Sequence, residues 1–270
     1  MVGNLFLRFP GGKSKALTFS YDDGVTQDKR LMEIFRKNGL KGTFNINSGL
    51  LGKDRRPAEE VVNAYDPEYF EVACHGVTHP DFTKCDDAVL MAQTVYDRKN
   101  LEALLGRPIH GMAYPYGAYD ARVITALKNA GIYYARTVKG TLNFEMPSEW
   151  LAWNPTCHHN NANLKSLADQ FIEPSTRRAP QLFYVWGHAY EFDNDDNWNV
   201  IEEFAEKLSG HEHIWYATNM EIYLAWRDFS RLKYSVDGRL IYNPNANDVW
   251  VANPAGDVFV IKSGETYVRK

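Results

Sequence analysis

The feature that most constrains this chain is the regular alternation of two apolar patterns. Short β-prone runs alternate with longer segments in which apolar residues recur at helical spacing. In segment 27–38, Leu31, Ile34 and Phe35 follow the i, i+3, i+4 spacing of one helix face, and Gly39 is placed to end the helix. Such alternation predicts right-handed βαβ units and a mostly parallel sheet, closed or nearly closed as a barrel.

The expected elements extend over most of the chain. The run 182–186 is almost continuously apolar, as a strand buried on both faces should be. The expected strands are residues 16–20, 42–46, 69–74, 109–114, 132–137, 182–186 and 214–217, and the expected helices lie near 27–38, 86–105, 123–127, 201–208 and 222–229.

The composition changes after about Leu232. Four turn signals separate short apolar runs there, and the segment has no helical period. We expect a small antiparallel β appendage at 232–270 that follows an α/β domain at 1–231. The turn signals are Asp237-Gly238, Asn243-Pro244, Ala255-Gly256 and Ser263-Gly264.

The composition excludes several classes of protein. The formal net charge of −4 disfavours a nucleic-acid partner held by phosphate contacts. No apolar run approaches the ~18 residues that a membrane span needs, so we expect none. Three cysteines are too few for a disulfide scaffold and favour a reducing compartment. Because the first residues lack the apolar core of a signal peptide, we expect a cytoplasmic protein, or an exported one whose signal peptide is absent from this sequence. The oligomeric state is not indicated.

Two adjacent carboxylates, Asp22 and Asp23, follow the expected strand 16–20. Active sites of parallel α/β folds lie at the C-terminal ends of the strands. Neighbouring carboxylates resist joint ionisation unless a cation lies near them. Asp-Asp-Gly is also a common turn, so the motif by itself leaves a structural role open.

Two imidazoles four residues apart, His75 and His79, follow the expected strand 69–74. They can bind one cation from a compact loop, which Pro80 favours, or they are two unrelated surface histidines. Together with a carboxylate of the aspartate pair they form a His₂Asp set, which leaves a coordination position open for water. We therefore predict one divalent metal ion, zinc first, with cobalt, nickel or manganese as alternatives.

Two further segments end expected strands. In segment 114–117 a tight turn leaves the backbone N–H of Tyr116 available to a ligand oxygen. His188 follows the most apolar strand, and Trp186 beside it suggests a titratable imidazole in a pocket with an aromatic wall. A plain turn and a structural histidine are the alternatives.

In this order, the four segments resemble the polysaccharide deacetylase family, which includes the nodulation-type chitooligosaccharide deacetylases. The resemblance covers roughly 16–216. TFSYDDG is similar to the family's T-F-[SD]-x-D-D-G motif, and HGVTH to its H-[ST]-x-x-H motif, with Gly76 at the normally hydroxylated position. PYG and the apolar strand that leads to His188 are similar to two later motifs. The resemblance implies a distorted (β/α) barrel.

The resemblance also implies a role for each matching residue. Asp22 would be the general base, and the backbone N–H of Tyr116 would help to hold an oxyanion. His188 would be the general acid. The implied metal ligands are Asp23, His75 and His79.

Two positions depart from the family's pattern. Its third motif begins with an arginine that orients the base, where this chain has Ala113; we predict that Arg136, which ends the following strand, delivers the guanidinium instead. The family's aspartate–tryptophan element, which supports the acid, has no clean match. We expect the aromatic groups that bind substrate to be Trp153, Trp186 and Tyr114.

No partner of His188 can be assigned from the sequence. Asp193 and Asp195 lie nearby, but their run is typical of a solvated acidic loop. His158 and His159 could line the cleft, but a polar loop is the preferred interpretation.

Three functions remain at this point. The first is a metal-dependent hydrolase that removes acetyl groups from an N- or O-acetylated polysaccharide or oligosaccharide. The second keeps the metal site but hydrolyses a C–N bond of a small cyclic amide or ureide, a change that the missing arginine favours. The third is a carbohydrate-binding protein without turnover, which the retained carboxylates and imidazoles disfavour.

Overall fold

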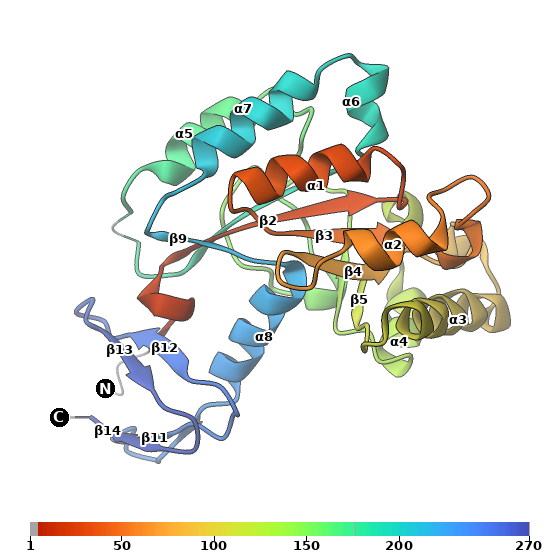
Figure 1. Cartoon of the computed structure of the whole chain (residues 1–270). Coiled ribbons are helices and arrows are strands. Elements are labelled where there is room, and N and C mark those ends of the chain that lie inside the picture. The colour runs from red at the N-terminus through yellow and green to blue at the C-terminus, as the bar shows by residue number, and fades with distance from the viewer. Residues whose placement is uncertain (1–4, 176, 270) are drawn as a thin grey trace.

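The computed structural model describes residues 5–175 and 177–269. An eight-stranded parallel sheet, curved as a half barrel, forms its centre (Figure 1). The strand order is β6-β5-β4-β3-β2-β8-β7, and β9 pairs with the first half of β2. The predicted (β/α) barrel with mostly parallel strands is confirmed. Its strands are β2 (Lys15–Asp22), β3 (Gly42–Ile46), β4 (Phe70–Cys74), β5 (Gly111–Ala113), β6 (Tyr134–Arg136), β7 (Cys157–His158), β8 (Gln181–Gly187) and β9 (Ile214–Tyr216).

Helices cover the outside of this sheet (Figure 1). Helices α1, α3, α4, α7 and α8 lie where the sequence predicts helices. Helices α2, α5 and α6 were not predicted, and neither was the short strand β7. The α-helices are α1 (Asp28–Lys37), α2 (Ala58–Ala64), α3 (Asp87–Leu105), α4 (Ala121–Asn129), α5 (Leu164–Ile172), α6 (Tyr190–Asn194), α7 (Trp198–Leu208) and α8 (Asn219–Ser230). Single 3₁₀ turns are η1 (Pro10–Gly12), η2 (Ser48–Leu50), η3 (Phe82–Lys84), η4 (Pro115–Gly117) and η5 (Trp150–Ala152).

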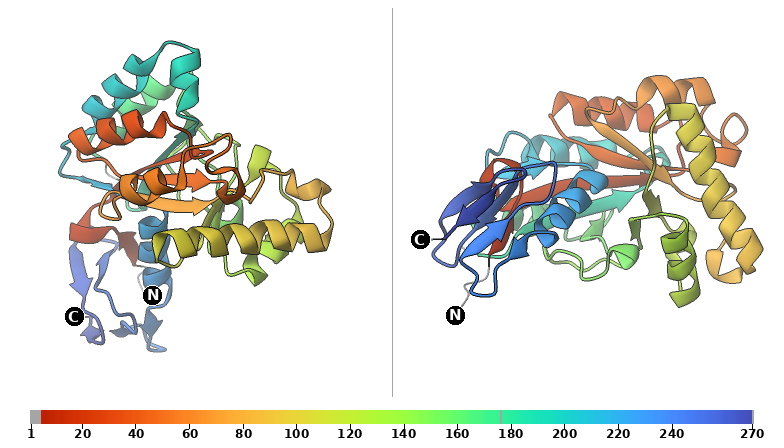
Figure 2. Two further views of the ribbon diagram at one scale, coloured as in Figure 1. Left: turned by 45° about the vertical axis from the view of Figure 1, so that its right-hand side comes forward. Right: turned by 90° about the horizontal axis from the view of Figure 1, so that it is seen from below.

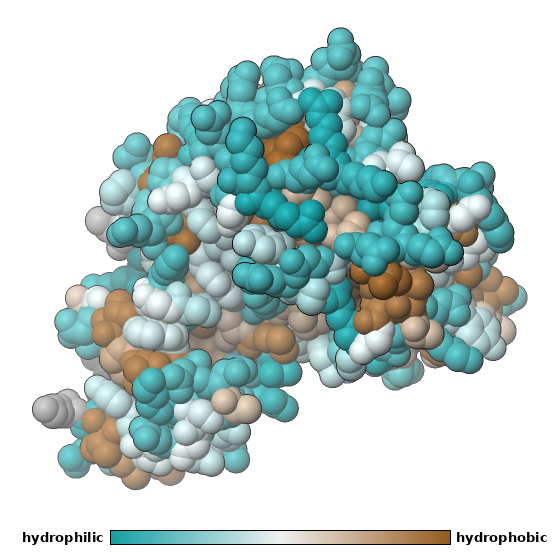
Figure 3. Space-filling model, in the orientation of Figure 1, coloured by the Kyte–Doolittle hydropathy of each residue, from teal (hydrophilic) through white to brown (hydrophobic). Residues whose placement is uncertain are grey.

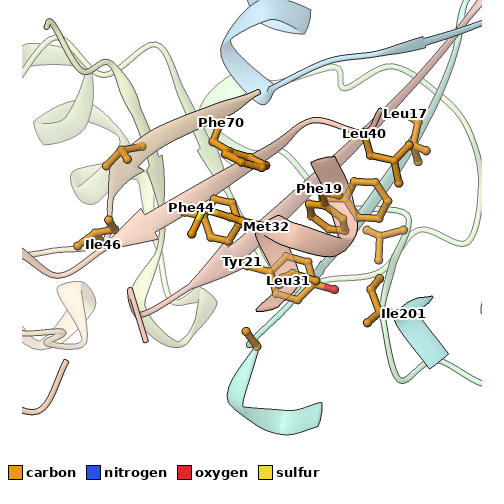
Figure 4. Packing of buried hydrophobic residues seen from close by; sticks show 14 of the residues in the cluster. Leu17, Phe19, Tyr21, Leu31, Met32, Leu40, Phe44, Ile46, Phe70 and Ile201 are labelled. Carbon is orange, nitrogen blue, oxygen red and sulfur yellow. The ribbon is translucent and has the colours of Figure 1, made fainter. Parts of the chain in front are cut away.

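Strand β2 determines which side chains reach the interior of the half barrel. Three of its odd-numbered residues, Leu17, Phe19 and Tyr21, point into the apolar core between sheet and helices (Figure 4). The Phe19 ring lies 4.4 Å from that of Phe35 in α1. From Thr18 onward its even-numbered residues are polar: Thr18 donates a hydrogen bond to Asn219, and Ser20 accepts one from Asn45. Because side chains alternate along a strand, the polar row ends in Asp22, at the C-terminal edge of the sheet.

The C-terminal segment forms antiparallel strands packed beside α8 and the N-terminal strand (Figure 2). Strand β1 pairs with β12, so residues 6–8 complete a sheet made mostly of the appendage. The predicted β appendage is therefore present, and the boundary between 231 and 232 stays a prediction. The strands are β1 (Phe6–Arg8), β10 (Lys233–Tyr234), β11 (Leu240–Tyr242), β12 (Val249–Ala252), β13 (Val258–Ile261) and β14 (Thr266–Val268).

The surface is largely polar. Hydrophilic residues cover most of the face drawn in Figure 3, and hydrophobic side chains reach it in scattered patches. Across the described parts of the chain, none of the helices has the length and apolar character needed to cross a membrane.

A buried ion pair fixes the loop that follows β3. Nη2 of Arg56 lies 2.9 Å from the Asp28 carboxylate of α1, and both side chains are fully buried. The same atom lies 2.9 Å from the hydroxyl of Tyr65 and 2.9 Å from the carbonyl oxygen of Val25. The backbone N–H of Arg56 also donates to the carbonyl of Gly24, directly after the aspartate pair. The loop is thus anchored against the end of β2.

Arg56→Met should destabilise the fold because it leaves the Asp28 carboxylate buried without its cation. Removal of one partner of a buried pair costs about 3–5 kcal/mol of the free energy of unfolding, which urea denaturation would measure. Lys29→Met is the matched control, since it breaks the exposed Lys29–Glu60 pair, and such pairs contribute about 0–1 kcal/mol. Equal losses in the two variants would contradict this account.

Candidate active site

The predicted site residues lie together at the C-terminal edge of the half barrel. Parallel pairing places the strand ends at one level: Asp22 is paired with Asn45, Ile46 with Cys74, and Tyr21 with Gly187. The loops that follow β2, β4 and β8 therefore start side by side. They carry Asp23, His75, His79 and His188.

The first cluster is the candidate metal centre, formed by Asp23, His75 and His79. Oδ1 of Asp23 lies 3.8 Å from Nε2 of His75 and 3.9 Å from Nε2 of His79. One ligand atom from each residue lies within 4.8 Å of the other two. Such spacing allows the three atoms to bind a single ion.

The hydrogen bonds around His75 leave one ring nitrogen to a cation. Its Nδ1 lies 2.8 Å from the carbonyl oxygen of Ala113, which can only accept, so Nδ1 carries the proton and Nε2 has a free lone pair. Nε2 of His75 and Oδ1 of Asp23 are both buried without a hydrogen-bond partner. A buried polar atom is costly unless it is paired, and a divalent cation satisfies both. The residues present therefore fit the predicted metal ion.

The backbone at this cluster is held in unusual conformations. Asp23 has a φ of 81° and His79 a φ of 59°, both in the left-handed region that side chains other than glycine rarely adopt. Asp97 of α3 accepts the backbone N–H of His75 at 2.9 Å, and Asn47 donates to the carbonyl of His75 at 2.6 Å. These contacts stabilise a local strain that is typical of functional sites.

Asp22 lies between this centre and His188. Its Oδ2 is 3.7 Å from Nε2 of His75 and 3.9 Å from Nε2 of His188, while its Oδ1 accepts a hydrogen bond from Asn45 at 2.8 Å. Burial alone would raise the pKa of Asp22, but Arg136, then His75 and His188, outweigh it and hold the pKa below its ordinary value. Asp22 is therefore a carboxylate at neutral pH.

Arg136 is brought to the position that the sequence analysis predicts. Its Nη2 donates to Oδ2 of Asp22, and its side chain is fully buried. The guanidinium lies 4.4 Å from the ring centroid of Trp186, a cation–π contact. The aromatic ring of Trp186 therefore supports the arginine, and the half-buried position of this tryptophan leaves part of it exposed at the site.

The substrate-binding roles predicted for Trp153 and Tyr114 are wrong. Both side chains are 1% exposed. Trp153 packs in the hydrophobic core against Tyr134 and Tyr184. The hydroxyl of Tyr114 donates a hydrogen bond to the carbonyl of Leu151. Tyr114 directly follows β5 and Trp153 directly follows η5, and both rings point into the core. No sugar can stack on them there.

Tyr116 lies beside the candidate metal centre, in the turn η4. Its φ is 58°, and its ring is 4.5 Å from that of His79. The side chain is 67% exposed. The oxyanion role of its backbone N–H stays a prediction, and its ring adds an exposed aromatic surface to the mouth of the site.

The second cluster contains a residue that the sequence analysis missed. Glu191, in α6, places Oε1 3.4 Å from Nδ1 of His188, and Oε2 3.1 Å from Nε2 of His158. Its Oε2 also accepts the backbone N–H of His188 at 3.0 Å. The three-residue spacing between His188 and Glu191, one helical turn, is the signal that could have identified this partner.

Glu191 affects the charge on His188. Burial would lower the pKa of His188, but the hydrogen bond with Glu191 and the charge of Asp22 outweigh it and raise the pKa above its ordinary value. Glu191 itself keeps a lowered pKa despite its burial, because His158 and His188 face it. The raised pKa favours the protonated form of His188 that an acid needs, and Nε2 lies on the side of Asp22.

The histidine pair before α5 does not form the expected polar loop. His158 lies in β7 and contacts Trp186, with ring centroids 4.6 Å apart. His159 is buried between Tyr21 and Phe192, and burial lowers its pKa to about 3. His159 is therefore a neutral core residue, and His158 belongs to the site. Asp193 and Asp195 are exposed as expected, although Asp193 lies in α6.

Comparisons with known proteins find a similar sequence pattern and a similar fold. Residues 10–135 match the sequence model of the polysaccharide deacetylase family. A Mycobacterium smegmatis protein assigned to the polysaccharide deacetylases aligns with a TM-score of 0.61 and 14% identity, over 84% of this chain and 95% of its own.

Two further structures share the fold. The family 4 carbohydrate esterase from Streptomyces lividans, in complex with acetate, aligns with a TM-score of 0.52 and 18% identity, over 76% of this chain and 92% of its own. The Streptococcus pyogenes deacetylase PplD, also with acetate, aligns with a TM-score of 0.51 and 19% identity, over 57% of this chain and 69% of its own. The resemblance to the polysaccharide deacetylase family is confirmed, by the family's sequence pattern over residues 10–135 and by the barrel over a longer span.

Proposed function

We propose that this protein is a metal-dependent deacetylase that removes acetyl groups from an N- or O-acetylated polysaccharide or oligosaccharide. One observation carries the proposal: the buried carboxylate of Asp22 lies between a triad that can bind a cation on one side and the imidazole of His188 on the other. The match to the polysaccharide deacetylase pattern and the fold shared with two acetate-bound hydrolases support it.

The chain's own residues supply the proton transfers. Asp22, whose lowered pKa keeps it ionised, accepts the proton of the water that attacks the acetyl carbonyl. His188, whose raised pKa favours its protonated form, donates a proton to the departing sugar nitrogen or oxygen. Asp23, His75 and His79 would hold the metal ion, which when bound supplies a Lewis acid that polarises the carbonyl and acidifies water.

Two residues position these groups without touching the substrate. Arg136 keeps the carboxylate of Asp22 oriented, and Glu191 holds Nδ1 of His188 so that Nε2 faces the reaction. His158 in turn holds Oε2 of Glu191. The backbone N–H of Tyr116 is the proposed donor to the oxyanion, a type of contact that contributes about 3 kcal/mol in related reactions.

Metal content is the first test. The purified protein should hold one divalent ion and release acetate from acetylated glycans, and a chelator should abolish release. His79→Ala should lower the affinity for zinc, measured by calorimetry, at least about 10–100-fold, the range that loss of an outer-sphere partner alone causes.

His211→Ala is the control, since this imidazole is not among the candidate metal ligands. It should keep both the zinc affinity and the acetate release of the wild type. Acetate release also separates the three candidate functions. Ring opening of a cyclic amide liberates no acetate, and a pure binding protein turns over neither acetylated glycans nor cyclic amides. Full zinc affinity in His79→Ala would remove this residue from the ligand set.

Glu191→Gln should move the basic limb of the pH–rate profile to lower pH. The carboxylate raises the pKa of His188, so without its charge the imidazolium loses its proton at a lower pH and the acid is lost sooner. The expected shift is about one unit. Glu202→Gln, an exposed glutamate of α7 paired with Arg30, is the matched control. An unshifted basic limb with normal folding would separate Glu191 from the acid.

Arg136→Ala should lower kcat while the metal content stays near one ion per chain. The guanidinium is a charged donor to Asp22, and loss of such a hydrogen bond costs about 10–100-fold. Arg136→Lys should recover part of the loss, since it restores the charge but not the planar fork. Unchanged turnover in Arg136→Ala would remove this residue from the mechanism.

A further inference from the structure

One charged side chain beside the candidate metal centre has no place in the proposed chemistry. Nη2 of Arg55 lies 3.6 Å from Oδ1 of Asp23, the same oxygen that faces both His75 and His79. Resting on the proposed function, we infer that Arg55 selects its substrate: it binds a carboxylate carried by the acetylated saccharide, as in glycans that contain uronic acids.

Arg55 is held at this position by its neighbours. Its backbone N–H donates to the carbonyl of Leu50, and Leu51 and Arg55 form a β-bridge. The next residue, Arg56, is fully buried and bonded to Gly24 and Asp28. The loop is therefore a closed, anchored unit, and the Arg55 guanidinium is fixed near the end of β2 rather than free in solvent.

The guanidinium has donors to spare. Nη1 bonds to the carbonyl of Asp54 at 3.2 Å, and Nε is buried without a partner. In the part of the chain that the structure describes, Asp23 supplies the single ion pair of Arg55, and at 3.6 Å that pair is loose. Oδ1 of Asp23 also belongs to the candidate metal centre. A cation bound there would neutralise the carboxylate charge that pairs with Arg55 and leave the guanidinium free for another anion.

Arg55 also lies where a substrate would approach. Its side chain is 23% exposed, and that of His79, next to the same oxygen, is 19% exposed. Asp23 and His75 beneath them are buried. The guanidinium is therefore partly accessible at the open side of the cluster.

Two arginine side chains lie at the site, and they differ in their partners. The other arginine of the site, Arg136, is used by Asp22. A planar guanidinium matches a carboxylate through two parallel hydrogen bonds, which makes a carboxylate on a neighbouring sugar the fitting occupant.

The test compares pairs of substrates that differ only in charge. Acetylated glucuronoxylan and acetylated oligogalacturonide fragments would be offered intact and after reduction of their carboxyl groups to alcohols. The wild-type protein should show a lower KM for each intact substrate. Arg55→Ala should raise that KM about 10–100-fold, the range for a hydrogen bond to a charged group, and should leave the reduced substrates unchanged.

Arg55→Lys should keep a smaller preference, since it restores the charge alone. Lys53→Ala is the matched control, because Lys53 lies in the same loop and its Nζ bonds to the carbonyl of Gly49. It should keep the preference of the wild type.

The outcomes separate the two proposals. Acetate release from neutral and reduced glycans without preference for the intact acids would overturn the role of Arg55 and leave the deacetylase standing. An equal loss in Arg55→Ala on every substrate, or a changed zinc affinity, would place Arg55 in the reaction centre instead and also overturn it. No acetate release from any acetylated glycan would refute the proposed function itself.

Discussion

The buried carboxylate of Asp22 is the constraint on which the rest of the site depends. It is 3% exposed, and a carboxylate removed from water in this way needs positive or donating groups around it. Those groups come from separate strands: Arg136 from β6, Asn45 from β3, and the imidazoles that follow β4 and β8. Only a sheet whose strand ends are in register brings all of them to one point.

The aspartate pair shows how one strand serves two tasks. Asp22 belongs to the polar row of β2 that faces the interior of the half barrel. Asp23 leaves the strand with a φ of 81°, which turns its carboxylate to the two imidazoles instead of the opposite face. Gly24 follows with a φ of 66°, and a side chain there would meet Ile46 at 3.1 Å. Both carboxylates lie near Nε2 of His75, but Asp22 also contacts Arg136 and His188, whereas Asp23 also faces His79.

The sequence predicts most of this arrangement because its signals are local. Strand ends followed by Asp, His or Arg are visible along the chain, and parallel pairing then places Asp22, His75, His188 and Arg136 at one edge. Glu191 was not predicted because α6 has only five residues and no apolar period that identifies it as a helix. Trp153 was assigned to the cleft because its type suits sugar stacking, but burial is decided by tertiary packing against Tyr134 and Tyr184.

The β appendage illustrates the same limit. Its turn signals predict antiparallel strands, and these are present. The pairing of β1 with β12 joins residues more than two hundred positions apart, and no local pattern indicates it. The positions of loop residues such as Arg55 are likewise not indicated by a local pattern. Their place depends on a buried neighbour, here Arg56, whose partners Asp28 and Tyr65 lie in other elements.

The two histidine clusters look alike in composition, yet their hydrogen bonds give them different chemistry. His158, His188 and Glu191 also have ligand atoms within 4.8 Å of one another. The backbone N–H of Asn160, however, donates to Nδ1 of His158, so the proton of the neutral ring sits on Nε2 and points to Glu191. In the neutral ring of His75, the Nδ1–H donates a hydrogen bond to the carbonyl of Ala113, and Nε2 is left bare.

A ring nitrogen that carries a proton cannot also bind a metal ion. A ring nitrogen without a proton, buried beside an unpaired carboxylate oxygen, favours the binding of a metal ion. The first cluster is therefore suited to a cation, and the second leaves His188 available for its proposed role as the acid. Because Asp22 lies near an imidazole of each cluster, the candidate metal ligands and the proposed base and acid are held together by groups that the fold itself orients.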